Sequence, residues 1–237
     1  RRPIFKGRGG ACARAARPAE VAAMNISPVD FASLLCSRLC HDLLSPVGAL
    51  NNGLELLADE TDPAMRERVL ELLTASASAS ANKLKFFRLA FGAAGGFGES
   101  VDTREARTAI EGLFSENKRL EIGWLVESER LPKVAVKALM NLAMIAGDAL
   151  VRGGRLDIGG EEESGRVEIV LRGQSPRIVL DAELRNALTG MGSDSDITPR
   201  AAGAYLAAEL VRQSGGSIQV SQPDEETLLF GATILAS

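Results

Sequence analysis

The chain of 237 residues contains a single histidine, His41, which Asp42 follows directly. A neutral imidazole nitrogen is a nucleophile near pH 7, and a carboxylate beside it can fix its tautomer and raise its basicity. One histidine cannot build a multi-His metal centre, so that class of site is excluded. The pair therefore favours chemistry that one imidazole carries out with a carboxylate as its partner.

The residues around His41 predict a long amphipathic helix that turns the histidine outward. Ser27-Pro28 is typical of a helix start, with an N-cap followed by proline, and apolar residues then recur at helical spacing to about Ala58. At roughly 100° per residue this apolar stripe points nearly opposite to His41, so the imidazole should project into solvent. The side chains expected beside it, with room for another protein to dock, are those of Ser37, Leu44, Ser45, Gly48 and Asn52.

Pro46 falls in the middle of this predicted helix. Proline removes a backbone N–H and crowds the carbonyl four residues earlier, that of Asp42, so we expect a kink one residue from the histidine. A proline inside a helix costs about 3 kcal/mol, which favours a functional reason for its position. A surface histidine beside a tolerated kink is the plain structural alternative.

A second long helix is predicted from Asp62-Pro63 to near Ala90, after the short connection 59–61. Such a short link makes the two helices antiparallel neighbours. Two helices of about 30 residues with apolar stripes along their full length have more apolar surface than a hairpin can bury. The sequence therefore predicts a homodimer in which two hairpins form a four-helix bundle.

Glycine-rich residues 92–100 predict a linker between this hairpin (27–91) and a second domain (101–237). Helical and extended segments alternate in the second domain, which indicates one layer of helices on one sheet. The fold class expected is α+β, a long antiparallel helical hairpin followed by an α/β sandwich domain. Helices are expected near 103–117, 134–151, 182–188 and 201–214, and strands at 120–126, 155–159, 167–172, 217–221 and 227–235.

Composition excludes several function classes. Residues 1–23 hold six basic groups and one acidic group, which leaves the remainder with a net charge of about −9 and argues against nucleic acid as a partner. We expect residues 1–26 to be a disordered segment, or one placed upstream of a native start at Met24. No apolar run reaches the roughly 18 residues that a membrane helix needs, so no membrane association is expected.

The three cysteines are odd in number and irregularly placed, which argues against a disulfide framework and favours a reducing cytoplasm. Cys36 and Cys40 are four residues apart near His41, but no fourth ligand is nearby. We therefore expect these two thiols to pack in the core and not to bind a metal. Trp124, on a predicted strand, is likewise expected in the core of the second domain.

The segment from His41 to Leu50 resembles the H-box of two-component histidine kinases, in which a phosphorylated histidine is followed by an acidic residue and then by a polar residue and proline. The matching residues are His41, Asp42, Ser45 and Pro46. The resemblance implies that His41 accepts a phosphoryl group from an acyl phosphate. Arg38, one turn earlier, is placed to help neutralise phosphoryl oxygens. The candidate catalytic residues are His41, Asp42, Arg38 and Ser45.

The second half resembles the ATP-binding domain of the same kinases without its working residues. In segment 141–146, the position that would supply a magnesium-binding Asn is Ile145. Segment 171–178 replaces the Asp-x-Gly-x-Gly box and has no carboxylate to bind adenine. In segment 203–207, Tyr205 replaces a glycine and would block close approach to phosphates. The resemblance implies a domain that keeps the kinase fold and binds neither ATP nor another cofactor.

An H-box on a helical hairpin, followed by a degenerate ATPase-like domain, resembles the ChpT-type histidine phosphotransferases of alphaproteobacterial phosphorelays. The likeness covers about residues 28–237, with 38–42 and 88–93 as its closest parts; it is specific at the H-box and architectural elsewhere. It implies a cytoplasmic homodimer that takes a phosphoryl group from the receiver-domain aspartate of a hybrid kinase and passes it through His41 to response regulators. In that family the regulators are a cell-cycle transcription regulator and an adaptor for proteolysis, and Mg²⁺ would arrive with the receiver.

Two other functions stay open on the sequence alone. An atypical ATP-dependent histidine kinase would bind nucleotide in spite of the altered boxes. A non-catalytic scaffold would dock receivers or kinases on the same helix face without accepting the phosphoryl group.

Overall fold

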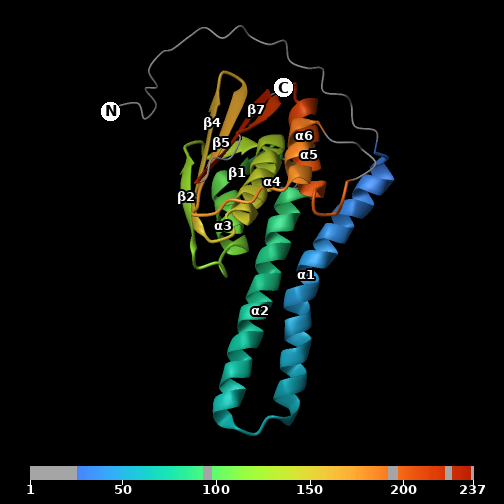
Figure 1. The fold of residues 1–237 in the computed structure, drawn as a ribbon, viewed down its shortest axis with the longest axis vertical. Coiled ribbons are helices and arrows are strands. Elements are labelled where there is room, and N and C mark those ends of the chain that lie inside the picture. Colours follow the sequence, from blue (N-terminus) through green and yellow to red (C-terminus); the bar gives the residue numbers. More distant parts are fainter. Residues whose placement is uncertain (1–25, 93–97, 192–196, 222–225, 236–237) are drawn as a thin grey trace, which may run out of the picture.

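The computed structural model describes residues 26–92, 98–191, 197–221 and 226–235. Within these ranges a long helical hairpin projects from a unit of helices and sheet (Figure 1), which confirms the α+β class expected from the sequence. Almost all of the predicted N-terminal segment, and residues 93–97 of the predicted linker, lie outside the described residues. None of the helices in the described ranges is both long and apolar enough to cross a membrane.

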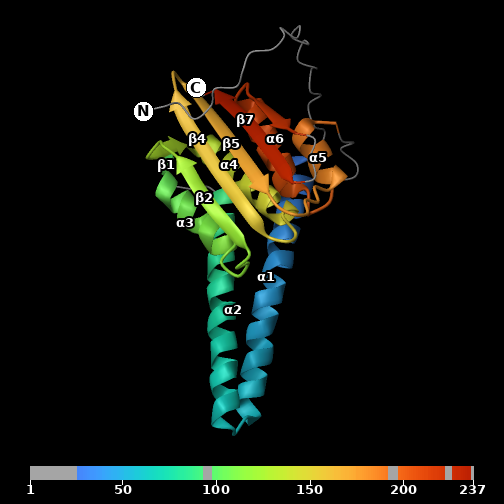
Figure 2. The ribbon, with the colours of Figure 1, turned by 60° about the vertical axis from the view of Figure 1, so that its left-hand side comes forward.

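The hairpin consists of α1 (Pro28–Asp59) and α2 (Pro63–Ala90), close to the predicted bounds. Both helices begin as the sequence predicts. The side chains of Ser27 and Asp62 accept hydrogen bonds from N–H groups of the first turn, and each is followed by proline. The short connection makes the helices antiparallel neighbours (Figure 1 and Figure 2).

Only two residues of α1 are buried, Pro46 and Gly53. A Cβ atom on Gly53 would lie 2.8 Å from Cδ2 of Leu73, so the missing side chain lets α1 and α2 approach closely. The helix continues through Pro46. In Figure 1 it changes direction near its middle, so that its first half leans away from α2 and its second half runs beside it.

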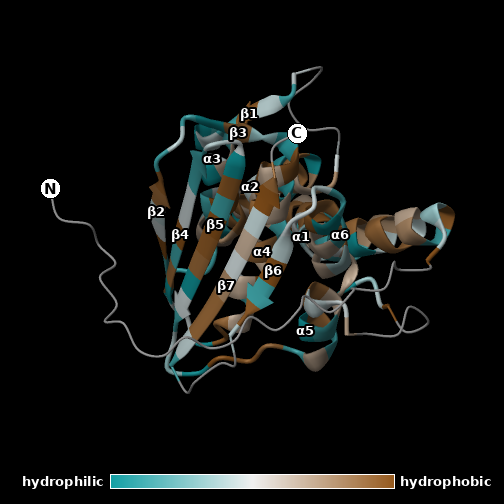
Figure 3. Ribbon diagram, turned by 90° about the horizontal axis from the view of Figure 1, so that it is seen from above, coloured by the Kyte–Doolittle hydropathy of each residue, from teal (hydrophilic) through white to brown (hydrophobic). Residues whose placement is uncertain are grey.

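The described residues from 98 onward, called here the C-terminal unit, are built on a five-stranded sheet with helices on one face (Figure 2 and Figure 3). The strand order is β2-β4-β5-β7-β6, in which β2 and β4 are parallel and the other neighbours antiparallel. The strands are β2 (Leu120–Val126), β4 (Gly154–Glu163), β5 (Arg166–Gln174), β6 (Ser217–Val220) and β7 (Thr227–Leu235). The helices are α3 (Thr103–Leu113), α4 (Lys133–Ala149), α5 (Ala182–Thr189) and α6 (Ala202–Gln213). These elements confirm the predicted layer of helices on one sheet.

A separate antiparallel pair is formed by β1 (Ser100–Asp102) and β3 (Arg130–Pro132). The sequence does not predict this pair, because strands of three residues are too short for a periodic pattern. β1 begins at Ser100, which the sequence assigns to the linker. β1 leads directly into α3 and β3 leads directly into α4, so their pairing brings the starts of these two helices together.

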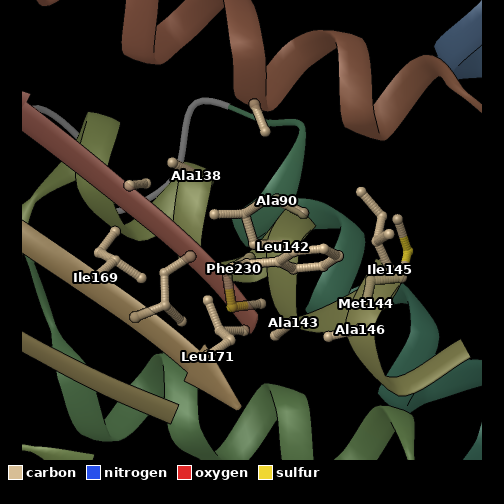
Figure 4. Packing of buried hydrophobic residues seen from close by; sticks show 14 of the residues in the cluster. Ala90, Ala138, Leu142, Ala143, Met144, Ile145, Ala146, Ile169, Leu171 and Phe230 are labelled. Atoms are coloured by element: carbon tan, nitrogen blue, oxygen red, sulfur yellow. The ribbon is translucent and has the colours of Figure 1, made fainter. Parts of the chain in front are cut away.

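One hydrophobic core holds the C-terminal unit together and takes in the end of α2. Thirteen of the 17 residues of α4 are buried, since this helix lies between the sheet and the other helices. Phe230 and Leu171 of the sheet meet Leu142 of α4 and Ala90 of α2 in this core (Figure 4). The hairpin is therefore anchored at the end where α2 stops, and its far end projects away from the core.

Two local expectations are wrong, and that for Trp124 holds in part. Cys36 and Cys40 are exposed and not in the core, because they lie on a flank of α1 that neither α2 nor the C-terminal unit covers. Trp124 packs against the core but stays partly exposed, since β2 is an edge strand. The helix expected to reach residue 117 ends at Leu113, because the residues after it turn toward β2.

Candidate functional site

His41 lies on the outer side of α1 with its side chain 85% exposed, as the apolar stripe predicts. Its Nδ1 is 3.0 Å from Oδ1 of Asp42, whose side chain is only 19% exposed. An ionised carboxylate only accepts hydrogen bonds, so this contact requires the proton on Nδ1 and leaves the lone pair of Nε2 free. The nucleophilic nitrogen therefore belongs to a ring that another protein can reach.

Asp42 is held from two further directions. Its Oδ2 accepts a hydrogen bond from Nε of Arg38 at 2.7 Å. Its backbone carbonyl lacks the usual helical donor, which would be the N–H of residue 46, because that residue is proline. Nζ of Lys83 in α2 donates to this carbonyl oxygen instead, at 2.9 Å. Pro46 thus frees an acceptor that ties the neighbour of His41 to the second helix of the hairpin.

Arg38 also contacts the C-terminal unit, and only 13% of its side chain is exposed. Its Nη1 donates to the carbonyl oxygen of Arg200 at 3.2 Å. Its Nη2 lies 3.7 Å from Oδ2 of Asp148 and 3.9 Å from Sδ of Met144, both in α4. The guanidinium group therefore joins Asp42 to the packed part of the molecule.

The predicted docking residues share the exposed side of α1 with His41. The side chains of Ser37, Leu44, Ser45 and Asn52 are exposed, and a Cβ atom on Gly48 would meet nothing within 4 Å. We call these five residues and His41 the docking face. Its role in binding another protein stays a prediction.

Residues at the positions of the kinase nucleotide boxes are buried in the core or contact the hairpin. Ile145 and Tyr205 are buried, and the ring of Tyr205 lies 5.0 Å from that of Phe31 in α1. Asn141 is buried in α4, where its Nδ2 donates to the carbonyl oxygen of Ala90 at 3.2 Å while its Oδ1 has no hydrogen-bond partner. These side chains connect the core of the C-terminal unit to both helices of the hairpin.

Metal ligands are not gathered in the part of the chain that the structure describes. No three His, Cys, Asp or Glu side chains there are grouped so that they could hold a metal ion. Cys36 and Cys40 are free thiols near His41, without a third ligand to complete a site.

Sequence reasoning misses Lys83, Asp148 and Arg200. All three lie far from His41 along the chain, on elements whose orientation to α1 no local pattern specifies. One signal for Lys83 is present, since Pro46 leaves a helical carbonyl without its donor and so predicts another donor nearby. No local signal singles out the contact of Asp148 with Arg38.

Known proteins are similar to this chain in both sequence and fold. Residues 103–226 match the family model of the histidine phosphotransferase C-terminal domain. The protein phosphotransferase ChpT of Brucella abortus (strain 2308) is 33% identical over 211 residues, which cover 88% of this chain and 98% of ChpT. A solved structure of a bacterial phosphotransferase has a TM-score of 0.78 to this one at 31% identity, covering 88% of this chain and 98% of the other. The chain thus belongs to the ChpT-type family of histidine phosphotransferases.

Proposed function

We propose that this chain relays a phosphoryl group between receiver-domain aspartates through Nε2 of His41. The observation that carries the proposal is an exposed imidazole with Nδ1 at 3.0 Å from Oδ1 of Asp42, in a chain 33% identical to a protein phosphotransferase. The contact with Asp42 leaves Nε2 as the nucleophile. The exposure of the ring lets the active site of another protein close over it.

The transfer forms a bond from Nε2 to phosphorus and breaks the bond from phosphorus to the carboxylate oxygen of a phosphorylated receiver aspartate. The electron pair of the broken bond leaves with that carboxylate, and the imidazole ring gains positive charge. Asp42 stabilises this charge through the proton on Nδ1. Attack on phosphorus by the aspartate of a second receiver reverses these steps and restores the neutral histidine.

This relay needs no ATP, because the acyl phosphate already supplies the driving force. The part of this chain is to position the imidazole and the receiver. The buried positions of Ile145 and Tyr205 support this proposal, since both side chains occupy places that the kinase pattern gives to nucleotide-binding residues. Mg²⁺ would arrive in the acidic pocket of the receiver domain.

The donor in this proposal is the receiver domain of a hybrid histidine kinase, and the acceptors are response regulators that control cell-cycle transcription and proteolysis in the cytoplasm. The docking face supplies the surface around His41, and Ser45 presents a hydroxyl close to the transferred group. Exposed leucines along the hairpin support a homodimer with a four-helix bundle; they are Leu54, Leu56, Leu70, Leu72 and Leu84.

The proposal is tested by following phosphoryl transfer from a purified phosphorylated receiver domain to the wild type and to His41→Ala. The wild type is expected to gain phosphate, and the variant to gain none while keeping its circular dichroism spectrum, because the side chain lies outside the core. Cys40→Ala is the matched control, since Cys40 is the exposed neighbour on the same helix. Labelling of His41→Ala would contradict the proposal.

A calorimetric titration with ATP tests for the kinase, and receiver binding measured beside the transfer assay tests for the scaffold. ATP binding at micromolar concentration with self-labelling would indicate a histidine kinase. A receiver that binds tightly but keeps its phosphate would indicate a scaffold.

A further inference from the structure

We infer that Arg38 and Asp148 are positioning residues through which the C-terminal unit orients the Asp42 and His41 pair for transfer. The inference deepens the proposed function and rests on it. It assigns the C-terminal unit an indirect part in the chemistry, which acts on His41 through Arg38 and Asp42. The chain of contacts runs from Asp148 to Arg38, then to Asp42 and the imidazole.

The guanidinium group of Arg38 is fully engaged on the inner side of α1. Nε holds Oδ2 of Asp42 at 2.7 Å, Nη1 holds the carbonyl oxygen of Arg200 at 3.2 Å, and Nη2 faces Oδ2 of Asp148 at 3.7 Å. A planar fork of donors suits such a bridge, which a lysine ammonium could not span. The sequence predicts that Arg38 neutralises phosphoryl oxygens, but this orientation fits the role of a fixed link better.

The anchors of Arg38 in the C-terminal unit are themselves fixed. Asp148 stands near the end of α4, the most buried helix of the core. The carbonyl of Arg200 precedes α6, and the side chain of Arg200 is held by Asp181, its Nη1 lying 3.1 Å from Oδ2. Asp181 in turn is the N-cap of α5. Arg38 is therefore attached to α4 and to the residue pair that leads into α6, two helices of the core, although the side chains of Asp148 and Arg200 are themselves exposed.

Fixing Arg38 fixes Asp42, and with it the tautomer of His41. Oδ2 of Asp42 is occupied by Arg38 and its backbone carbonyl by Lys83, which leaves Oδ1 directed at Nδ1 of the imidazole. A neighbour that holds a catalytic group in the reactive orientation lowers the entropy cost of reaching that orientation during the reaction. Without Asp148, the one charged anchor among the three contacts of Arg38 in the C-terminal unit is lost, and Arg38 and Asp42 gain freedom to rotate.

The electrostatics of Asp148 support a functional reason for its position. Loss of solvent contact raises the pKa of this carboxyl, and the nearby charge of Asp42 raises it further. The cations of Arg38, Arg200 and Lys83 oppose that rise. Since the net direction is upward, the fold disfavours the ionised side chain, although about half of it is exposed. Stability alone does not explain an acid at this place.

The test compares Asp148→Asn with Glu105→Gln in the full chain. Glu105 pairs with Arg88 at 2.6 Å, so the control variant also breaks an ion pair between the hairpin and the C-terminal unit, but one with no link to His41. Single-turnover transfer from a phosphorylated receiver domain is measured for both, together with receiver affinity. Because the chain has one histidine, nitrogen-15 NMR of labelled histidine reports the tautomer of His41 directly.

Asp148→Asn is expected to slow transfer by about threefold to tenfold at unchanged receiver affinity, and to reduce the share of the tautomer with the proton on Nδ1. Arg38→Lys is expected to do the same, because lysine keeps the positive charge but lacks the planar guanidinium group that bridges Asp42 and the C-terminal unit. Glu105→Gln should leave the rate and the spectrum at wild-type values.

A wild-type rate and spectrum for Asp148→Asn would overturn the inference, as would equal slowing by Glu105→Gln. A wild type that accepts no phosphoryl group would instead contradict the proposed function. In that case the NMR comparison still decides whether Asp148 and Arg38 orient the His41 ring.

Discussion

α1 and α4 show how differently the two regions of the molecule are built. α4 buries 13 of its 17 residues, whereas α1 buries two of 32. Large apolar side chains of the hairpin remain exposed, among them Leu54, Leu72 and Leu84. The C-terminal unit thus has a large core of its own, although Leu125 and Leu229 on its sheet stay exposed, whereas the hairpin has very little core of its own. Exposed apolar surface of this kind is typical of a protein interface. The candidate site lies on the sparsely packed helix but takes its rigidity from the densely packed unit.

The largest effect expected from this comparison is on the core of the C-terminal unit. Phe230→Ala should lower the free energy of unfolding by about 3–5 kcal/mol, because it opens a cavity among fully buried side chains. Leu229→Ala, at the next position of β7 but exposed, should lower it by less than about 1 kcal/mol. Urea titration followed by circular dichroism measures both. Equal losses would show that the core is not where the structure places it.

A second prediction concerns the exposed leucines of the hairpin. Leu54→Glu should weaken the proposed dimer, because each copy would lose about 2 kcal/mol of apolar burial in a four-helix bundle. Sedimentation velocity over a range of concentrations gives the dissociation constant. Leu125→Glu on the open sheet face is the control, as Leu125 is equally exposed but not on the hairpin. Unchanged association in Leu54→Glu would argue against the four-helix bundle.

The two glycines of α1 sharpen the comparison further. Gly48→Ala should raise the free energy of unfolding by about 0.5–1 kcal/mol, since alanine favours the helix and its Cβ meets no neighbour. The same change should weaken receiver binding, because the methyl group stands on the docking face. Gly53→Ala should give no such gain, because its Cβ would lie 2.8 Å from Cδ2 of Leu73. Thermal unfolding and receiver titration of both variants check this. A gain in both would mean that α1 and α2 are not in close contact at Gly53.

The smallest change in the free energy of unfolding is expected at Asp148, where the hairpin meets the C-terminal unit. A carboxyl whose pKa is raised by folding binds its proton more tightly in the folded state, so its contribution to stability is lost as pH rises through the folded pKa. Asp148→Asn should therefore be slightly more stable than the wild type at neutral pH, with a difference that shrinks as pH falls below that pKa. The charged groups that set this balance are Arg38, Asp42, Arg200 and Lys83.

Asp102 supplies a control, because folding lowers its pKa where folding raises that of Asp148. A hydrogen bond from the side chain of Arg104 lowers the pKa of Asp102, so its contribution is present at neutral pH and lost as pH falls through the folded pKa. Asp102→Asn should be less stable than the wild type at neutral pH. Melting temperatures across a pH series measure both variants, and a shift of the same sign in the two would be inconsistent with these pKa directions.

Local pattern was enough to predict much of the architecture. The caps at Ser27 and Asp62 and the prolines after them mark the starts of both long helices, because capping and the fixed φ of proline act within a few residues. The strands β2 and β7 were predicted to the residue. The pair β1 and β3 was missed, since three residues carry no period and their pairing joins segments about 30 residues apart.

The candidate site also has features that local pattern predicts and contacts that it does not. The sequence by itself determined that His41 faces outward, that Asp42 lies beside it, and that Pro46 frees the carbonyl of Asp42, because helical periodicity and proline sterics are local. Only the tertiary structure decided that Lys83 donates a hydrogen bond to that carbonyl oxygen and that Asp148 pairs with Arg38. Those contacts depend on how α1 packs against α2 and α4, and the packing of side chains distant in sequence sets that arrangement.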